Sequence, residues 1–549
     1  MIDNKIPIID LFAGPGGLGE GFSSVLSNKT RVFDIKLSIE KDANAHKTLE
    51  LRSFFRKFEK GKVPNEYYQV LKEKKLLKRE SLILDLYEKF PKESFEAKKE
   101  AWLAELGSDN FPSSKIDKRI KESLNGQKDW LLIGGPPCQA FSLVGRSRVG
   151  GIDDEDHRVY LYKEYLRIIA VHHPTVFVME NVKGLLSANV NGEKVFDWIL
   201  NDLRDPSSVF KDTNSPKYKI YSLSSKPERI DNFGHPLYKD DRDYLIQSEK
   251  FKIPQKRHRV ILLGIREDVD VLPSILNEGL KETDLKSVIG DLPKVRSGLG
   301  RSIISSETVN GTKKRIYKNE IDSDLNWEQK INDIKREILS WKGFESKLPF
   351  KEVKVSSYGL GSEYIEYKTP SKDNPLLEWY SDENLKGVSN HETRTHLVED
   401  LKRYLFGSLY AEKFKRFPRL RDYEAHSNEL MPDHVSALSG KFADRFRVQM
   451  PDCAATTVTS HISKDGHYFI HYDPDQCRSL TVREAARIQT FPDNYLFCGP
   501  RTAQYHQVGN AVPPYLAYQI AEIVNNVFIK YNIKEGITNI QKDPHILEK

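Results

Sequence analysis

The sequence is poor in cysteine and contains no long apolar segment. Its 549 residues include only four cysteines, Cys138, Cys453, Cys477 and Cys498, and no two of them form a CxxC pair. This pattern argues against a disulfide scaffold and against a zinc ribbon. No apolar run approaches the roughly 20 residues that span a bilayer, and the first residues read directly into a strand, not into a signal peptide. We therefore expect a cytoplasmic protein with no membrane partner and no metal.

A strong excess of charge of one sign is also missing. The formal net charge is +6, from 85 Lys and Arg against 79 Asp and Glu. Such a mildly basic balance permits a nucleic-acid partner without requiring one. The apolar content of 38% suffices for hydrophobic cores, and 549 residues exceed what one core usually supports. We expect two or three domains.

The start of the chain alternates strands and helices. It reads as a strand from Ile6 to Phe12, a glycine-rich turn, a helix from about Leu18 and a second strand that ends at Glu40. This order predicts an α/β fold with a parallel sheet that helices cover on both faces.

Changes in composition predict the domain boundaries. Residues 1–293 read as the first domain, interrupted at about 51–126 by a helical insertion rich in Lys and Glu. Residues 294–476 read as a second, irregular, β-rich domain. Residues 477–549 return to amphipathic helices, which we expect to dock on a core.

A glycine-rich loop, DLFAGPGGLGEGF (10–22), follows the first strand. Gly14, Gly16 and Gly19 form a GxGxxG pattern, which lets the backbone turn tightly and brings a ligand close to a helix N-terminus. Glu40, at the end of the next strand, could accept hydrogen bonds from both hydroxyls of a ribose. The pattern serves NAD, FAD and S-adenosylmethionine alike, and a tight turn without a ligand would also show it. No Walker-type lysine follows the glycines, which argues against ATP.

Four further polar residues lie at the ends of predicted strands. Cys138, in IGGPPCQAFS, lies at the carboxyl edge of the sheet, where open α/β folds bind ligands. Glu180 follows the apolar run TVFVM, so partial desolvation would suit its carboxyl group to donate a proton. Arg257 and Arg259 point to one side of a strand and could share an anion or a polar ligand. Taken singly, each also has a plain structural reading, as a buried small cysteine, a surface glutamate or a solvated basic turn.

Six segments together resemble one family, the DNA (cytosine-5) methyltransferases. In the family's order they are DLFAGPGGLGEGF, GGPPCQAFS, MENVKGLL, IPQKRHRVILLGIR, RSLTVREAARIQTFPD and QVGNAVPP. The resemblance implies a Rossmann-like, S-adenosylmethionine-dependent methyltransferase fold with a mostly parallel, doubly wound sheet. Residues 294–476 would be the target-recognition domain, and residues 477–549 would complete the catalytic domain.

The resemblance also assigns catalytic roles. The thiolate of Cys138 would add to C6 of cytosine and make C5 reactive toward the methyl group. Glu180 would protonate or hydrogen-bond N3, Arg259 would hold the O2 edge, and Arg257 would support the loop or a phosphate. Because C6 lies inside the base stack, the cytosine must be flipped out.

Cofactor and DNA contacts follow from the same match. The implied S-adenosylmethionine contacts are Phe12, Ala13, Gly14, Gly16, Gly17, Leu18, Glu40, Asp109, Pro136, Leu161, Asn510 and Val512. Lys41 departs from the family, which often has an apolar residue there against the adenine, and the insertion obscures the acidic adenine contact for which Asp109 is a candidate. Ser142, Arg146 and Arg148 would contact DNA from a mobile lid, residues 139–151. The basic run KFKRFPRLR (413–421) reads either as DNA-facing or as a solvated loop.

The implied substrate is a short specific sequence of double-stranded DNA. We expect a monomer in the bacterial cytoplasm, associated with the nucleoid, and a restriction–modification context with a cognate endonuclease. A tRNA cytosine-5 methyltransferase and a catalytically silent DNA-binding relative stay open as alternatives. The long region 294–476 favours duplex DNA, and the presence of Cys138 and Glu180 favours an active enzyme. An NAD dehydrogenase would rest on the glycine pattern alone.

Overall fold

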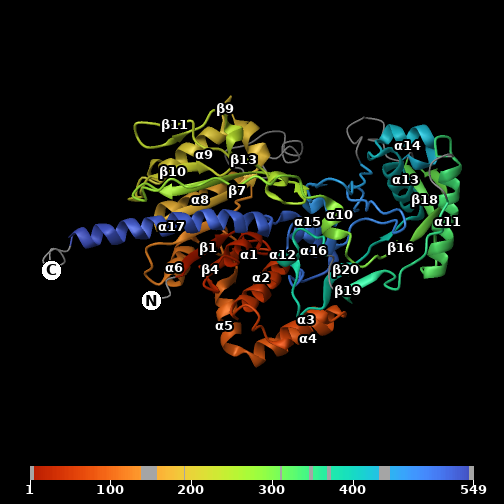
Figure 1. Ribbon diagram of the computed structural model, residues 1–549, viewed down its shortest axis with the longest axis horizontal. Coiled ribbons are helices and arrows are strands. Elements are labelled where there is room, and N and C mark those ends of the chain that lie inside the picture. The colour runs from red at the N-terminus through yellow and green to blue at the C-terminus, as the bar shows by residue number, and fades with distance from the viewer. Residues whose placement is uncertain are drawn as a thin grey trace. The chain divides into compact units, whose positions relative to one another are not determined.

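The chain folds into two compact units (Figure 1). The computed structural model describes residues 5–137, 157–190, 192–309, 312–344, 350–367, 372–431 and 445–542. The first unit comprises residues 1–63, 87–281 and 511–549, and the second comprises residues 64–86 and 282–510. Each unit is therefore assembled from segments that are far apart in the sequence.

An eight-stranded sheet forms the centre of the first unit. Its strands are β1 (Ile6–Leu11), β4 (Phe33–Glu40), β5 (Ala101–Leu103), β6 (Leu131–Gly134), β7 (Val176–Val182), β10 (Tyr218–Ser222), β13 (Leu245–Gln247) and β15 (His258–Arg266). The strand order is β10-β15-β7-β6-β1-β4-β5, and β13 pairs with β15 off this path. The strands from β7 to β5 are parallel, whereas β10, β13 and β15 pair antiparallel. The strand order reverses between β1 and β6, which is where such sheets bind ligands beyond their carboxyl ends.

Alternating side chains give the sheet two apolar faces. Ile8 of β1 packs in one core cluster with α1 (Gly17–Ser23) and α17 (Pro514–Lys542). The next residue, Ile9, packs in the other cluster with α6 (Ser113–Leu124), α8 (His157–His172) and α9 (Val195–Arg204). Leu131 and Leu132 of β6 divide between the two clusters in the same way. Period-2 alternation within fully apolar strands is typical of a sheet that is buried on both sides.

Four helices lie between β4 and β5. They are α2 (Ala43–Arg56), α3 (Asn65–Lys72), α4 (Leu76–Lys89) and α5 (Pro91–Glu100). The segment expected as a helical insertion, 51–126, is indeed mostly helical, but it also contains β5, which pairs with β4, and α6, which packs on the sheet. Part of this segment therefore belongs to the sheet of the first unit, while residues 64–86 belong to the second unit.

The second unit combines helices with separate two-stranded sheets. Its longest helices, α11 (Asp324–Ser340) and α13 (Val398–Phe414), contribute most of its apolar core. Its sheets pair β16 (Gly298–Leu299) with β21 (Thr395–His396), β17 (Arg301–Val309) with β18 (Thr312–Asn319), and β19 (Gly361–Glu366) with β20 (Gly387–Glu392). Short helices complete the unit: α10 (Leu285–Ile289), α12 (Leu377–Tyr380), α14 (Leu420–His426), α15 (Val482–Ile488) and α16 (Arg501–Asn510). Within the described ranges of both units, no helix combines the length and the apolar character needed to cross a membrane.

Candidate active site

The glycine-rich loop follows β1 in a backbone conformation that suits glycine. Gly14 and Gly16 have φ angles of 58° and 95°, and Phe12, at 56°, adopts the same left-handed region without being a glycine. A β-carbon at Gly14 would meet no atom within 4 Å, so open space lies beside it. A β-carbon at Gly17 would instead collide with the carbonyl oxygen of Val512. The loop is thus packed closely against the start of the C-terminal segment and is open at Gly14.

Glu40 holds this loop from the end of the neighbouring strand β4. Its carboxylate accepts hydrogen bonds from the backbone N–H groups of Gly14 and Asp42, both at 2.7 Å. Burial raises the pKa of Glu40. Because each carboxylate oxygen can accept a second hydrogen bond, both oxygens can still bind the hydroxyls of a ribose. Glu40 therefore fixes the loop, a role that the sequence does not predict, and its contact with a ribose stays a prediction.

Asp10, near the end of β1, is a buried acidic residue that is absent from the sites predicted from the sequence. Its side chain is fully buried, and neither carboxyl oxygen has a hydrogen-bond partner among the described residues. Burial raises the pKa of Asp10 well above its ordinary value. In the sequence, Asp10 could have been recognised as unusual because it is the one charged residue in the apolar run IPIIDLF. Unpaired buried acceptors next to the glycine-rich loop mark a place where a proton or a donor group would be stabilised.

The other predicted cofactor residues occupy varied positions. Leu18 and Val512 are 6% and 8% exposed and belong to the core cluster that contains α1 and α17. Ala13 donates its backbone N–H to Ile39. Leu161 is a buried residue of α8. Asn510 ends α16 in the second unit, where its exposed side-chain amide lies 3.2 Å from a ring nitrogen of His506.

The predicted acidic adenine contact, Asp109, lies beyond the end of β5. Asp109 is exposed in the loop that leads to α6. Closer to the strand, Glu105 forms an ion pair with Lys41 at 3.0 Å. This carboxylate restrains the lysine that departs from the family pattern. Glu105 is not predictable from the sequence, because β5 contains only three residues and gives no recognisable strand pattern.

Glu180 and Arg259 form an ion pair at the ends of two adjacent strands. In the β7–β15 ladder, Glu180 lies opposite Ile261 and Arg259 lies opposite Val182, so the two side chains are diagonal neighbours on one face. Nε of Arg259 lies 2.8 Å from Oε1 of Glu180. Its N–H does not point at the carboxylate, so the contact is an ion pair without an aligned hydrogen bond.

The loop after β6 passes close to this ion pair. A β-carbon at Gly135 would lie 2.9 Å from Oε2 of Glu180, so a side chain there would push the carboxylate out of this position. Asn181 donates its side-chain amide to the carbonyl of Pro136 over a long 3.5 Å and accepts the backbone N–H of Val182 at 2.8 Å. Asn181 follows Glu180 in the segment MENVKGLL. These contacts fix the backbone immediately before Cys138.

Arg257 lies just before β15 and is almost fully buried. Its backbone N–H donates to the hydroxyl of Ser248 at 3.1 Å, and that hydroxyl donates to the carbonyl of Arg257 at 2.5 Å. Burial lowers the pKa of Arg257 well below its ordinary value. Cys138, Ser142, Arg146 and Arg148 lie outside the described residues, which stop at residue 137 and resume at residue 157. Their predicted roles stay predictions.

The sheet and the arrangement of loops define a class of enzyme. A parallel sheet with a glycine-rich loop after its first strand and an acidic residue at the end of the next strand binds nucleoside-containing cofactors. Residues 88–207 and 230–526 match the model of the C-5 cytosine-specific DNA methylase family. The chain belongs to this family, and the family resemblance inferred from the six sequence segments is confirmed. Family membership implies S-adenosylmethionine as the methyl donor.

Individual relatives agree with this assignment. The type II methyltransferase M.Bpa9945I of Bacillus paralicheniformis is 31% identical over 542 residues, which cover 95% of this chain and 98% of that protein. The DNA (cytosine-5-)-methyltransferase M.ApeKI of Aeropyrum pernix is 26% identical, covering 74% of this chain and 82% of that protein. Among solved structures, a prophage-encoded DNA modification methyltransferase (E. coli) matches with a TM-score of 0.50 and 17% identity, covering 95% of this chain and 99% of that chain. The last comparison supports the Rossmann-like α/β fold predicted from the sequence.

Proposed function

We propose that this chain transfers a methyl group from S-adenosylmethionine to C5 of a flipped-out cytosine in a short specific sequence of double-stranded DNA. The observation that supports this most directly is the Glu180–Arg259 ion pair, at 2.8 Å, beside the loop that leads to Cys138. An acid and a guanidinium on one face of adjacent strands match the N3 and O2 edge of a cytosine. The 31% sequence identity with a type II methyltransferase supports a restriction–modification context and a cognate endonuclease.

The chain's residues divide the chemistry between them. C5 of cytosine is too weak a nucleophile to take a methyl group directly, so the Cys138 thiolate first adds to C6. Glu180 gives a proton or a hydrogen bond to N3, which stabilises the electron pair displaced by that addition, while Arg259 holds O2. The bound cofactor supplies an electrophilic methyl group to C5. Loss of the C5 proton to a base and departure of the sulfur then restore the aromatic ring.

The residues around β1 and β4 fit this cofactor. Glu40 has a free acceptor position on each oxygen for the ribose hydroxyls, and Gly14 leaves open space beside the loop. The unpaired carboxyl group of Asp10 is suited to a donor from the amino-acid end, directly or through water. Together with the predicted contacts from Phe12 to Leu18, these residues would bind the methionine and the ribose.

Residues 294–476, which lie within the second unit, are our proposed target-recognition region, and the loop with Ser142, Arg146 and Arg148 is the proposed lid. We propose a monomer, because one chain contains both the cofactor-binding and the recognition region. We propose that it acts in the bacterial cytoplasm, at the nucleoid.

The decisive experiment is bisulfite sequencing of plasmid DNA from cells that express the wild type or Cys138→Ser. We expect methylated cytosines in one short motif with the wild type and none with the variant. Purified protein with labelled S-adenosylmethionine and either duplex DNA or tRNA provides the substrate control. Unmodified plasmid in both strains, or label on tRNA alone, would contradict the proposal, provided that circular dichroism shows both proteins folded.

A further inference from the structure

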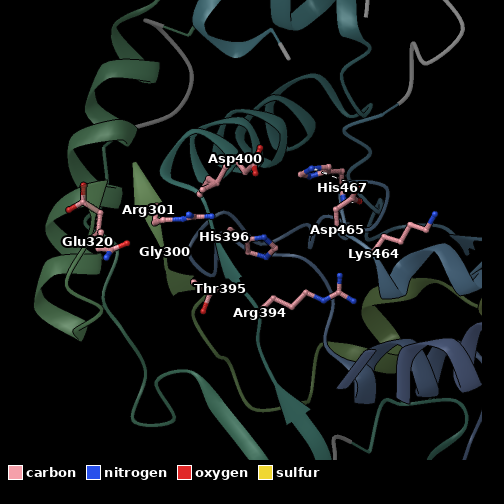
Figure 2. A pocket seen from close by; sticks show the side chains of 12 residues that line it. Gly300, Arg301, Glu320, Arg394, Thr395, His396, Asp400, Lys464, Asp465 and His467 are labelled. Atoms are coloured by element: carbon pink, nitrogen blue, oxygen red, sulfur yellow. Dashed lines mark hydrogen bonds and ion pairs between the residues drawn. The ribbon is translucent and has the colours of Figure 1, made fainter. Parts of the chain in front are cut away.

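Charged side chains of both signs meet in a cavity of the second unit, which has a volume of about 560 Å³. Figure 2 shows three basic and three acidic residues on its wall: Arg301, Arg394, Lys464, Glu320, Asp400 and Asp465. Such a mixed wall favours neither an anion nor a cation, so its charge does not define a class of ligand. A cluster of charges in the first unit, in contrast, has a defined pairing and includes the helix that follows the glycine-rich loop.

This cluster joins α1, α2 and α5 of the first unit. Arg52 of α2 holds the carboxylate of Glu20 on α1 with two donors: its Nε donates to Oε2 at 2.8 Å, and its Nη2 donates to Oε1. One turn farther along α2, Nη2 of Arg56 donates to Oε1 of Glu100 at 2.7 Å, and its Nη1 lies 3.7 Å from Glu20. Nζ of Lys57 lies 2.6 Å from the other oxygen of Glu100. The two carboxylates and three cations therefore form one continuous network.

The network is buried and ionised. Glu20, Arg52, Arg56 and Glu100 are 4%, 4%, 9% and 3% exposed. Burial alone would raise the pKa of Glu20, but the charge and hydrogen bonds of Arg52 outweigh burial and lower this pKa. Burial is likewise outweighed at Glu100, where Lys57 and Arg56 lower the pKa to about 2. Removing one partner of a buried ion pair leaves an uncompensated charge, so each side chain depends on the others being in place.

The helix that carries Glu20 is intrinsically weak. Three of the seven residues of α1 are glycine, and its N-cap residue, Gly16, provides no side-chain cap. Both features disfavour a helix. All seven residues are nevertheless buried, and a β-carbon at Gly21 would collide with Ala517 of α17. Packing against neighbouring elements, and not the sequence of α1 itself, must therefore fix its position.

Contacts from the two ends of α2 reach the glycine-rich loop and the helix after it. Where α2 begins, its N-cap residue Asp42 donates its backbone N–H to one oxygen of Glu40 at 2.7 Å. The other oxygen of Glu40 accepts the backbone N–H of Gly14 in the loop, also at 2.7 Å. Near the end of α2, Arg52 holds Glu20. The start of α2 is thus linked to the loop, and its end is linked to the helix into which the loop leads.

We propose that Glu20 is a positioning residue for S-adenosylmethionine: held by Arg52, it fixes α1 and the glycine-rich loop in the arrangement that binds the cofactor. The inference rests on the proposed function and deepens its cofactor-binding part. Because both oxygens of Glu20 accept hydrogen bonds from Arg52 inside the cluster, Glu20 acts through α1 and not by contact with the cofactor. A loop that is ordered before binding loses less conformational freedom when the cofactor arrives, and it therefore binds more tightly.

Glu20→Gln tests this role, because glutamine keeps the size of the side chain and removes its charge. We expect the dissociation constant for S-adenosylmethionine, measured by calorimetry on the full chain, to rise about tenfold. The KM for the cofactor should rise in parallel, whereas kcat at saturating cofactor should stay within about threefold. Asp117→Asn is the matched control, since it breaks the 2.8 Å ion pair between Asp117 of α6 and Arg167 of α8 in the same unit. Both variants should unfold at lower urea concentration than the wild type, but only Glu20→Gln should bind the cofactor less tightly.

The double variant Glu20→Met with Arg52→Met separates positioning from stability. Two apolar side chains of similar length leave neither charge of this pair buried, so the urea midpoint should return close to the wild-type value. Methionine packs without fixing a direction, so cofactor binding should stay about tenfold weaker. Recovery of wild-type affinity together with stability would overturn the inference, as would wild-type affinity in Glu20→Gln. Wild-type protein that binds no S-adenosylmethionine would refute the cofactor part of the proposed function itself, so the two failures are distinguishable.

Discussion

Glu180 and Arg259 neutralise each other in the protein alone, and a cytosine would have to share or replace that contact. Their carboxylate and guanidinium are 2.8 Å apart but not aligned as a hydrogen bond, so a base edge can compete for both. Each group would then satisfy one edge atom of the base. Gly135 has no side chain and so leaves the carboxylate of Glu180 the position that it occupies.

Glu180→Gln separates the acidic role from the shape of the side chain. Glutamine keeps the size of glutamate but provides no carboxylic proton, so we expect methyl transfer to slow by about 10²- to 10⁴-fold. Single-turnover methylation of duplex DNA measures this rate, and calorimetry should find S-adenosylmethionine binding unchanged. Glu267→Gln, an exposed residue of the same unit, should retain wild-type turnover. A Glu180→Gln enzyme within about threefold of the wild-type rate would exclude an acidic role for this residue.

The raised pKa of Asp10 predicts that the free energy of unfolding depends on pH. Burial raises its pKa in the folded state above the unfolded value near 3.8, so folding favours the protonated form. Stability is then lost as pH rises above the unfolded pKa, and the loss is complete above the folded pKa. It amounts to about 1.4 kcal/mol for each pH unit that separates the folded pKa from the unfolded pKa. We expect Asp10→Asn to raise the unfolding free energy at pH 8 more than at pH 4.5, as measured by urea denaturation.

The same substitution should weaken the cofactor site. If Asp10 accepts a donor from S-adenosylmethionine, the asparagine variant will be more stable yet bind the cofactor less tightly. Asp34→Asn, at a partly exposed position of β4, is the control for the pH effect. A stability difference that does not change with pH would show that Asp10 is charged in both states.

At the scale of elements, the sequence predicts best where a pattern is long or rigid. The run IPIIDLF and the glycine loop predict β1 and the turn after it, because apolar strands and left-handed glycines leave strong signals. The three residues of β5 leave none, so the range 51–126 reads as helices throughout although it includes a strand of the sheet. Its neighbour Glu105 was missed for the same reason.

Pairing across elements is the part that a single sequence cannot supply. Glu180 and Arg259 were each predicted from the strand end beside them, but their ion pair depends on the register of β7 against β15. The hydrogen bond from Asn181 to Pro136 likewise depends on how β6 lies beside β7. Long-range contacts of this kind follow from the strand order and not from local spacing.

A substitution in the loop after β6 tests whether this loop positions Glu180. Gly135→Ala would force its methyl group to within 2.9 Å of Oε2 of Glu180, so the carboxylate must move by a few tenths of an ångström. Displacement of the proposed acid on this scale should lower kcat about threefold to tenfold, with little change in melting temperature. Gly279→Ala, where a β-carbon meets nothing nearer than 3.3 Å, is the control. A large loss of stability in Gly135→Ala would assign this glycine to folding and not to positioning.

At the scale of the whole molecule, the two ends of the chain meet in one core. Ile8, Leu18 and Phe22, near the start, belong to the same apolar cluster as Leu516 and Ile520, near the end. The C-terminal segment also touches the glycine loop, because the carbonyl of Val512 lies where a side chain at Gly17 would be. The core of the first unit and the packing of its glycine loop therefore both depend on residues from Val512 onward.

This dependence predicts the effect of truncation. A chain that ends at residue 510 lacks buried side chains of α17, among them Leu516, Ile520, Val524, Val527 and Phe528. Each contributes about 1.5–3 kcal/mol, so their sum reaches the entire stability of an ordinary domain. We expect residues 1–510 to lose the near-ultraviolet circular dichroism of the first unit and to bind no S-adenosylmethionine. A chain that ends at residue 534 retains all these side chains and should bind it normally, whereas cofactor binding by the shorter chain would show that the first unit folds without its last helix.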